Sequence, residues 1–138
     1  MEESPLDRLL TAVDELDVDA VMALVGPEPR FLAADGRRAA GTQAVRELLT
    51  ELFAALRSTT HRVTAQWQQD NVWIAEVDAD YELQDWLELK ALPRAFIVRM
   101  GEGGSADVRV YGAHEHPLTE HRTGEEGMWI GTRWVPPL

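Results

Sequence analysis

The 138-residue sequence has no cysteine, a single lysine and no apolar run long enough to cross a membrane. The absence of cysteine excludes disulfides, thiolate catalysis and cysteine-ligated zinc sites. Basic residues are few and dispersed, and the 24 acidic residues give a net charge of −11. This charge disfavours binding to nucleic acid or to an anionic membrane, and is best interpreted as a solubility feature. The acidic N-terminus lacks the basic start of a secretory signal, so we expect a cytoplasmic protein.

The length and the 45% hydrophobic content suit one domain with a sizeable core, and no linker divides the chain. We therefore expect a single domain over residues 1–138, with residues 119–138 as a C-terminal extension. Apolar residues at helical spacing predict three helices in the first half of the chain. Ser4-Pro5, Asp17 and Thr42 are the predicted start signals of these helices.

Strand signals dominate the second half. Asp35-Gly36 predicts a short hairpin before the third helix, and from residue 59 the apolar period changes to two. The predicted long strands cover residues 60–69, 72–84, 94–100 and 106–116, with a longer connection at 83–93. This order predicts an α+β fold with the helices on one face of an antiparallel sheet. Met128–Val135 is predicted to be an extra strand or an ordered arm.

The order of elements and one local run resemble a known family. The run A-A-D-G-R-R-A-A-G-T-Q-A-V-R-E-L-L, at residues 33–49, is similar to the hairpin–glycine–helix junction of the NTF2-like superfamily, within it the SnoaL-like polyketide-cyclase branch. The element order matches over residues 5–118. The resemblance implies a cone in which a curved sheet wraps around the helices and encloses an apolar pocket, and it implies a homodimer. The superfamily holds enzymes of several kinds and non-catalytic adaptors, so fold does not settle function.

Strand alternation predicts which side chains face the pocket. On residues 72–84 an apolar set alternates with the acids Glu76, Asp78, Asp80 and Glu82, which we expect to face outward and to pair with Arg99 and Arg109. The predicted pocket-facing side chains that shape a ligand site are His61, Trp67, Trp73, Phe96, Val98 and Val110. The same alternation places Tyr81, His114 and His116 on that side.

These side chains indicate acid–base chemistry. His114 could remove a proton from a carbon next to a carbonyl, with Tyr81 donating a hydrogen bond to the developing enolate and His116 assisting. The hypothesis is therefore a cofactor-independent cyclase or isomerase acting on a small apolar, polyketide- or steroid-like carbonyl compound. His114-x-His116 alone is a weak metal signal, so neither a metal nor a cofactor is expected. The competing interpretation makes these histidines hydrogen-bonded residues of a non-catalytic ligand-binding or dimerisation module, or of an adaptor that uses the acidic face.

The chemistries found among members of the resembled family match this chain unequally. Three residues of the steroid-isomerase pattern are missing or doubtful in this chain. The first helix has no tyrosine, the only acid near the hairpin is Asp35, and Phe96 stands where the pattern has a protonated aspartate. Epoxide-hydrolase-like activation of water by arginine and aspartate would need Asp78 and Asp80 to face inward, so it is a minor alternative. A cyclase-like acid or histidine near the end of the last strand is the best match.

Overall fold

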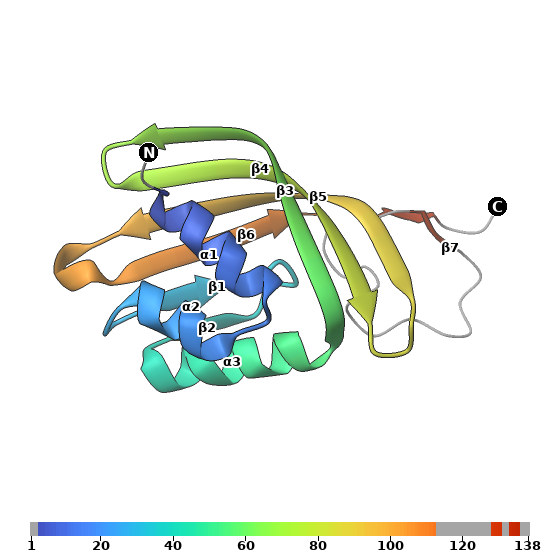
Figure 1. The fold of residues 1–138 in the computed structure, drawn as a ribbon, viewed down its shortest axis with the longest axis horizontal. Coiled ribbons are helices and arrows are strands. Elements are labelled where there is room, and N and C mark those ends of the chain that lie inside the picture. Colours follow the sequence, from blue (N-terminus) through green and yellow to red (C-terminus); the bar gives the residue numbers. More distant parts are fainter. Residues whose placement is uncertain (1–2, 113–127, 131–132, 136–138) are drawn as a thin grey trace.

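A computed structural model of the chain describes residues 3–112, 128–130 and 133–135. The helices and strands that build the main body are α1 (Pro5–Asp14), α2 (Val18–Val25), β1 (Arg30–Leu32), β2 (Arg38–Ala40), α3 (Thr42–Ala54), β3 (Leu56–Gln69), β4 (Val72–Leu83), β5 (Glu88–Met100), a 3₁₀ turn (Glu102–Gly104) and β6 (Ala106–Gly112). Figure 1 shows the three helices on one side of a curved sheet. The predicted α+β architecture is confirmed.

Local sequence signals explain where the helices begin. Ser4 accepts a hydrogen bond from the Asp7 backbone N–H, and the Asp7 carboxylate accepts one from Ser4, which makes a complete capping box before α1. The Asp17 side chain caps α2 through the Ala20 N–H. The third helix is different, because Gly41 is its N-cap residue and Thr42 is its first helical residue.

The sheet has the order β2-β1-β6-β5-β4-β3. All neighbouring strands are antiparallel except β1 and β6, which pair in parallel, so the sheet is mixed and not purely antiparallel. Strand pairing between segments more than 70 residues apart leaves no local sequence signal. Leu56 follows α3 almost directly, which places β3 at the far edge of the sheet, where it curves across the helices (Figure 1).

The connection between β4 and β5 is much shorter than the sequence predicts. The predicted connection ran to residue 93, yet β5 begins at Glu88 and Pro93 is paired with Asp78. Proline lacks an N–H donor, so it is accepted in strands next to irregularities of the ladder. Such an irregularity lies close by, between the pairs at Ala79 and Tyr81, and Ala91 has a φ of +54°.

The two last described strands, β7 (Met128–Ile130) and β8 (Arg133–Val135), pair with each other as a separate antiparallel hairpin. The predicted strand at Met128–Val135 is therefore two short strands, and neither is paired with the six-stranded sheet. None of the helices in the described part of the chain is long and apolar enough to span a membrane.

The main core lies between the helices and the sheet face that Ala75, Val77, Phe96 and Val108 share, which is called the inner face below. These four side chains are at most 4% exposed. Burying a side chain of valine or phenylalanine size contributes about 1.5–3 kcal/mol. A second, smaller cluster continues this face where β3, β4 and β5 curve away from the helices. Its buried members are Leu56, Ala79, Tyr81 and Leu92.

Candidate functional site

A cavity of about 120 Å³ opens between the inner face of the sheet, α1, α3 and the β1–β2 hairpin. It lies where the main core meets the smaller cluster. Most of its wall is apolar, and the aromatic members are Phe31, Phe53, Tyr81 and Phe96. Four polar side chains interrupt the apolar wall on the strands, which are Thr59, His61, Tyr81 and Arg94. A mostly apolar hollow with a few converging polar groups is the usual form of a small-molecule site.

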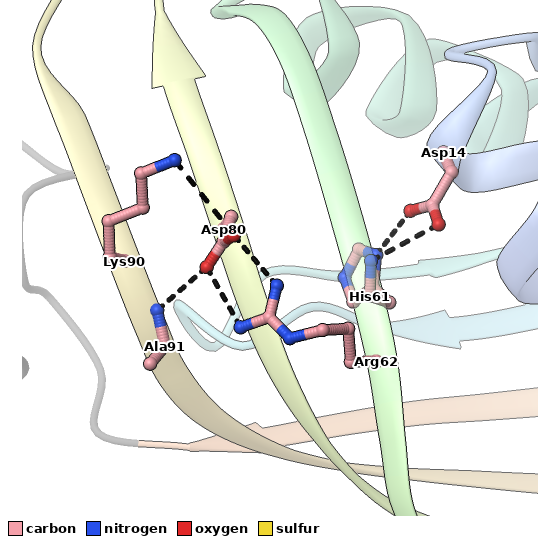
Figure 2. Close-up of polar contacts among 6 residues, drawn as sticks. All are labelled: Asp14, His61, Arg62, Asp80, Lys90 and Ala91. Atoms are coloured by element: carbon pink, nitrogen blue, oxygen red, sulfur yellow. Dashed lines mark hydrogen bonds and ion pairs between the residues drawn. The ribbon is translucent and has the colours of Figure 1, made fainter.

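The best-defined polar group in the wall is a histidine–aspartate pair. The His61 Nδ1 atom lies 2.6 Å from Asp14 Oδ1, and the His61 backbone N–H donates to Asp14 Oδ2 at 3.1 Å. Figure 2 shows Asp14 reaching from the end of α1 toward the ring on β3. The His61 side chain is only 2% exposed. Donation of Nδ1–H to the carboxylate leaves the Nε2 lone pair as the basic position of the neutral ring.

Aromatic rings hold His61 from two sides. The centroid of the Phe96 ring is 5.3 Å from the imidazole centroid and that of Tyr81 is 6.0 Å away, both edge to face. Such contacts are favourable beyond the area they bury. They restrict the orientation of the ring, and the Asp14 carboxylate restricts it further.

Thr59 lies two residues before His61, on the same face of β3 and directly opposite Tyr81 on β4. It is 5% exposed, and its Oγ1 atom has no hydrogen-bond partner among residues 3–112, 128–130 and 133–135. A buried hydroxyl without a partner costs about 1–3 kcal/mol. A cost of this kind in the wall of a cavity indicates a position where a bound molecule can supply the partner.

Arg94 brings a positive charge into the same wall. It is 3% exposed, and its guanidinium carbon lies 5.9 Å from the centroid of the Tyr81 ring. Its Nη1 group donates a long, 3.5 Å hydrogen bond to the carbonyl of Pro93. Burying a guanidinium is expensive unless hydrogen bonds or opposite charges compensate it.

The rim of the cavity carries three charged residues that are already paired with one another. Arg37 contacts Asp35 at 2.8 Å and Glu51 at 3.2 Å. Burial alone would raise the pKa of Asp35, but the hydrogen bonds from the Arg37 side chain and backbone outweigh it and lower that pKa. The same contacts raise the pKa of Arg37. Asp35 is therefore held ionised in a turn, which suits a structural role better than that of a proton acceptor.

The acidic stripe of β4 faces away from the cavity, as predicted, but its partners differ from the prediction. Asp80 is bound by Arg62 at 2.7 Å and by the backbone N–H of Ala91 at 2.8 Å (Figure 2). The Arg62 hydrogen bond is the main reason that the pKa of Asp80 falls to about 2. Arg109 pairs with Asp107 on its own strand. Within the stripe, Asp80 and Glu82 contact arginines of β3, Arg62 and Arg57, whereas Arg109 is separated from β4 by β5.

Four residues that the sequence assigns to the site lie together in the cavity wall: His61, Tyr81, Phe96 and Val110. Trp73 and Val98 share the inner face but lie farther along the sheet in the main core. Trp67 does not face the cavity, because an extra residue, Thr64, forms a β-bulge between Val63 and Ala65. The bulge reverses the alternation, and Trp67 is 53% exposed. His114 and His116 lie outside the described residues.

Three polar groups were missed from the sequence, Asp14 beside the wall and Arg94 and Thr59 in it, although two of them left signals. Asp14 follows Leu6 and Leu10 of α1 at four-residue spacing, and these leucines are buried. The spacing therefore indicates that the Asp14 carboxylate lies on the packed side of the helix. Arg94 is in phase with Phe96 on β5, which places it on the inner face. The unpartnered state of the Thr59 hydroxyl could only be known from the structure. No group of three potential metal-ligating side chains occurs within the described part of the chain.

Comparison with known proteins identifies a family model, described as a SnoaL-like domain, that matches residues 6–116. A protein with a ketosteroid-isomerase-like fold from Catenulispora acidiphila, in complex with trimethylamine, is 12% identical, with a TM-score of 0.69 over 80% of this chain and 86% of that one. A protein from Shewanella denitrificans, described as a SnoaL-like polyketide cyclase, is 8% identical, with a TM-score of 0.67 over 78% and 86%. An NTF2-like protein of unknown function from Burkholderia pseudomallei is 12% identical, with a TM-score of 0.68 over 78% and 87%. No curated protein matches the sequence. Identities this low show a shared fold and do not show a shared activity.

Proposed function

Because the chain belongs to the SnoaL-like domain family, we propose that its cavity performs cofactor-independent acid–base chemistry on a small apolar carbonyl compound, with His61 as the base. The observation that carries this proposal is the 2.6 Å contact between His61 Nδ1 and Asp14 in the cavity wall. A carboxylate in this position orients the imidazole and stabilises the imidazolium that forms when Nε2 takes a proton. His61 therefore replaces His114 as the leading candidate, and His114 and His116 stay as alternative bases.

The proposed reaction begins when Nε2 of His61 removes a proton from a carbon next to the carbonyl. The C–H electron pair moves to the carbonyl oxygen and gives an enolate, which accepts a hydrogen bond from the hydroxyl of Tyr81 or Thr59. Return of the proton to a different carbon gives an isomer. Attack of the enolate carbon on a second carbonyl of the same molecule closes a ring, and the alkoxide that results takes the proton from His61. Both routes balance without an oxidant or a reductant.

One observation favours a second function, that of a non-catalytic binding module. Asp14 accepts hydrogen bonds from both the ring and the backbone of His61, which also suits a structural clamp between α1 and β3. In this alternative the cavity holds an apolar ligand, or the domain assembles with a second copy, without chemistry. The epoxide-hydrolase-like alternative has little support, because Asp80 faces away from the cavity and is engaged by Arg62.

The test is proton exchange at a carbon next to a carbonyl. The purified protein is incubated in D₂O with 2-tetralone, an apolar ketone with acidic C–H bonds, and deuterium incorporation is followed by ¹H NMR. We expect catalysed exchange that falls about 10²- to 10⁴-fold in His61→Asn, because general-base catalysis contributes a factor of that size. His114→Ala is the matched control and should keep most of the activity. Loss in His114→Ala with retention in His61→Asn would move the base to His114, and no exchange by the unmodified protein would favour the binding module.

A further inference from the structure

The geometry points to a carboxylate on the molecule that occupies the cavity. We propose that the ligand is an apolar, ring-containing carboxylic acid whose carboxylate is bound by Arg94 and Thr59. The inference rests on the proposed function, because it takes the same cavity as the substrate site and names the class of its substrate. It concerns binding alone, so it can be tested without any catalysed reaction.

Arg94 supplies the charge that recognises the acid. The side chain lies on the inner face of β5, opposite Val77 of β4 and Gly112 of β6. A guanidinium stays protonated inside proteins and presents five N–H donors in one plane. It can therefore bind groups of the chain and a carboxylate at the same time, and a paired contact to both carboxylate oxygens is its strongest arrangement.

The strand beside Arg94 is shaped to leave room for this side chain. A Cβ atom placed on Gly112 would collide with Nη1 and Cδ of Arg94 and with the Pro93 carbonyl. Glycine at this position lets the guanidinium lie against the backbone of β6. Any larger residue at position 112 would displace Arg94, so the placement of the charge depends on two residues.

Thr59 supplies an independent indication of a ligand. Thr59 is 5% exposed and belongs to the cavity wall, and its buried hydroxyl has no partner within the described ranges 3–112, 128–130 and 133–135. A carboxylate oxygen would accept the O–H and remove the cost of leaving it unpaired. A purely apolar ligand would leave that cost in place.

The spacing of the polar groups sets the size of the ligand. The His61 ring and the Arg94 guanidinium lie 6.0 Å and 5.9 Å from the centroid of the same Tyr81 ring. The imidazole and the guanidinium are therefore no farther apart than about twice their distance from the Tyr81 ring. This is the span of one or two fused rings with a substituent. The carboxylate end would face Arg94 while the carbon to be deprotonated lies near His61. The charged side chains of the rim, Asp35, Arg37 and Glu51, are paired with one another.

The experiment compares a matched pair of probes, 2-naphthoate and its neutral analogue 2-naphthamide, by isothermal titration calorimetry at pH 7. We expect the acid to bind at least about tenfold more tightly than the amide, which is the size expected for a hydrogen-bonded charge. Arg94→Gln should remove this preference by weakening the acid, while the amide keeps its affinity to within about threefold. Arg94→Lys should retain part of the preference, because a point charge remains without the planar fork.

The outcomes separate this inference from the proposed function. Equal binding of acid and amide by the unmodified protein, or no binding of either probe at millimolar concentration, would overturn the inference, and neither result needs a variant that folds. An unchanged preference in folded Arg94→Gln would overturn it too. Asp80→Asn, on the opposite face of the sheet, should bind 2-naphthoate as the unmodified protein does. If exchange activity is absent while the preference for the acid is present, the proposed catalysis fails and the carboxylate site stands.

Discussion

His61 and Arg62 are neighbours on β3, and each is bound by an aspartate, yet the two pairs differ in almost everything except distance (Figure 2). The shortest contacts are 2.6 Å for His61–Asp14 and 2.7 Å for Arg62–Asp80. The His61 side chain is 2% exposed and faces the cavity, whereas Arg62 is 48% exposed on the opposite face. Charges interact more strongly where water is excluded, so the two contacts should differ in energy and in use. The burial of a pair, and not the distance between its atoms, therefore indicates where chemistry can occur.

The outer pair has a local structural task. Asp80 binds Arg62 on β3 and the N–H of Ala91 on β5, and it lies within 3.9 Å of Lys90. The carboxylate thus ties together three strands at the point where the β4–β5 ladder is irregular. Exposed ion pairs of this kind contribute about 0–1 kcal/mol each.

The largest difference between the two pairs should be seen in catalysis. Asp14→Asn removes the charge that orients His61, and we expect the rate of 2-tetralone exchange to fall about 100-fold or more, as for other His–Asp pairs. Asp80→Asn is the matched substitution on the other face and should change the rate less than about twofold, since it touches no wall group. The two rates are measured by the same NMR assay. Equal losses in both variants would show that the pair facing the cavity has no special role.

The next difference concerns stability. Asp14→Ala leaves the ring N–H and the backbone N–H of His61 without their acceptor, and we expect the free energy of unfolding to fall by about 1–3 kcal/mol. Arg62→Ala should lower it by much less, because this ion pair is exposed to solvent. Urea denaturation followed by tryptophan fluorescence measures both values. A loss in Arg62→Ala as large as that in Asp14→Ala would contradict the distinction between the two faces.

Two threonines of β3 sharpen the same comparison. The Thr59 hydroxyl is unpaired in the described part of the chain, whereas the Thr64 hydroxyl donates to the Glu76 carbonyl at 3.1 Å. We expect Thr59→Val to leave the free energy of unfolding unchanged or to raise it by up to about 1 kcal/mol, and Thr64→Val to lower it by about 0.5–1 kcal/mol. Thermal unfolding of the two variants checks the signs. Destabilisation by Thr59→Val would mean that the hydroxyl has a partner in the folded chain.

The smallest expected effect is the acid response of the outer pair. The pKa of Asp80 is about 2 in the folded chain against an ordinary value of 3.8, so its contribution is complete above about pH 4 and is lost as pH falls toward 2. Because the pair is exposed, solvent screens it and this contribution should be small. Denaturation of the unmodified protein and of Arg62→Ala at pH 7 and pH 3 should give a difference that shrinks at the lower pH. A difference that stays constant would show that Arg62 does not act through the charge of Asp80.

Much of the architecture could be predicted because the local patterns are unbroken. Alternation on β4 runs without interruption from Trp73 to Tyr81 along the inner face, so the buried and exposed sides were assigned correctly there. Capping residues marked the starts of α1 and α2. The β4–β5 connection was predicted too long, because an irregular ladder and an internal proline interrupt the alternation from which strands are predicted. Pairing of β1 with β6 depends on tertiary structure and has no local signature.

The site could be predicted only in part, for related reasons. His61 and Tyr81 lie on the predicted face because the alternation around each is unbroken: the irregularities of β3 fall between Leu56 and Ser58 and between Val63 and Ala65. The Asp14–His61 contact joins residues 47 positions apart, and no sequence spacing indicates it. Trp67 was assigned to the wrong face because one additional residue changes the phase of everything that follows it, and bulges have no distinctive composition.

The additional residue Thr64 divides β3 into two halves whose side chains alternate in opposite phase. Residues before it are in phase with the cavity, whereas residues after it are in the opposite phase, so Gln66 and not Trp67 turns toward α1, where it contacts Ser4. Loss of the one residue would interchange the two sets over the second half of the strand while leaving Thr59 and His61 in place. A deletion at the bulge would therefore turn Trp67 toward the inner face and Gln66 away from Ser4 without changing the phase of the residues in the cavity wall.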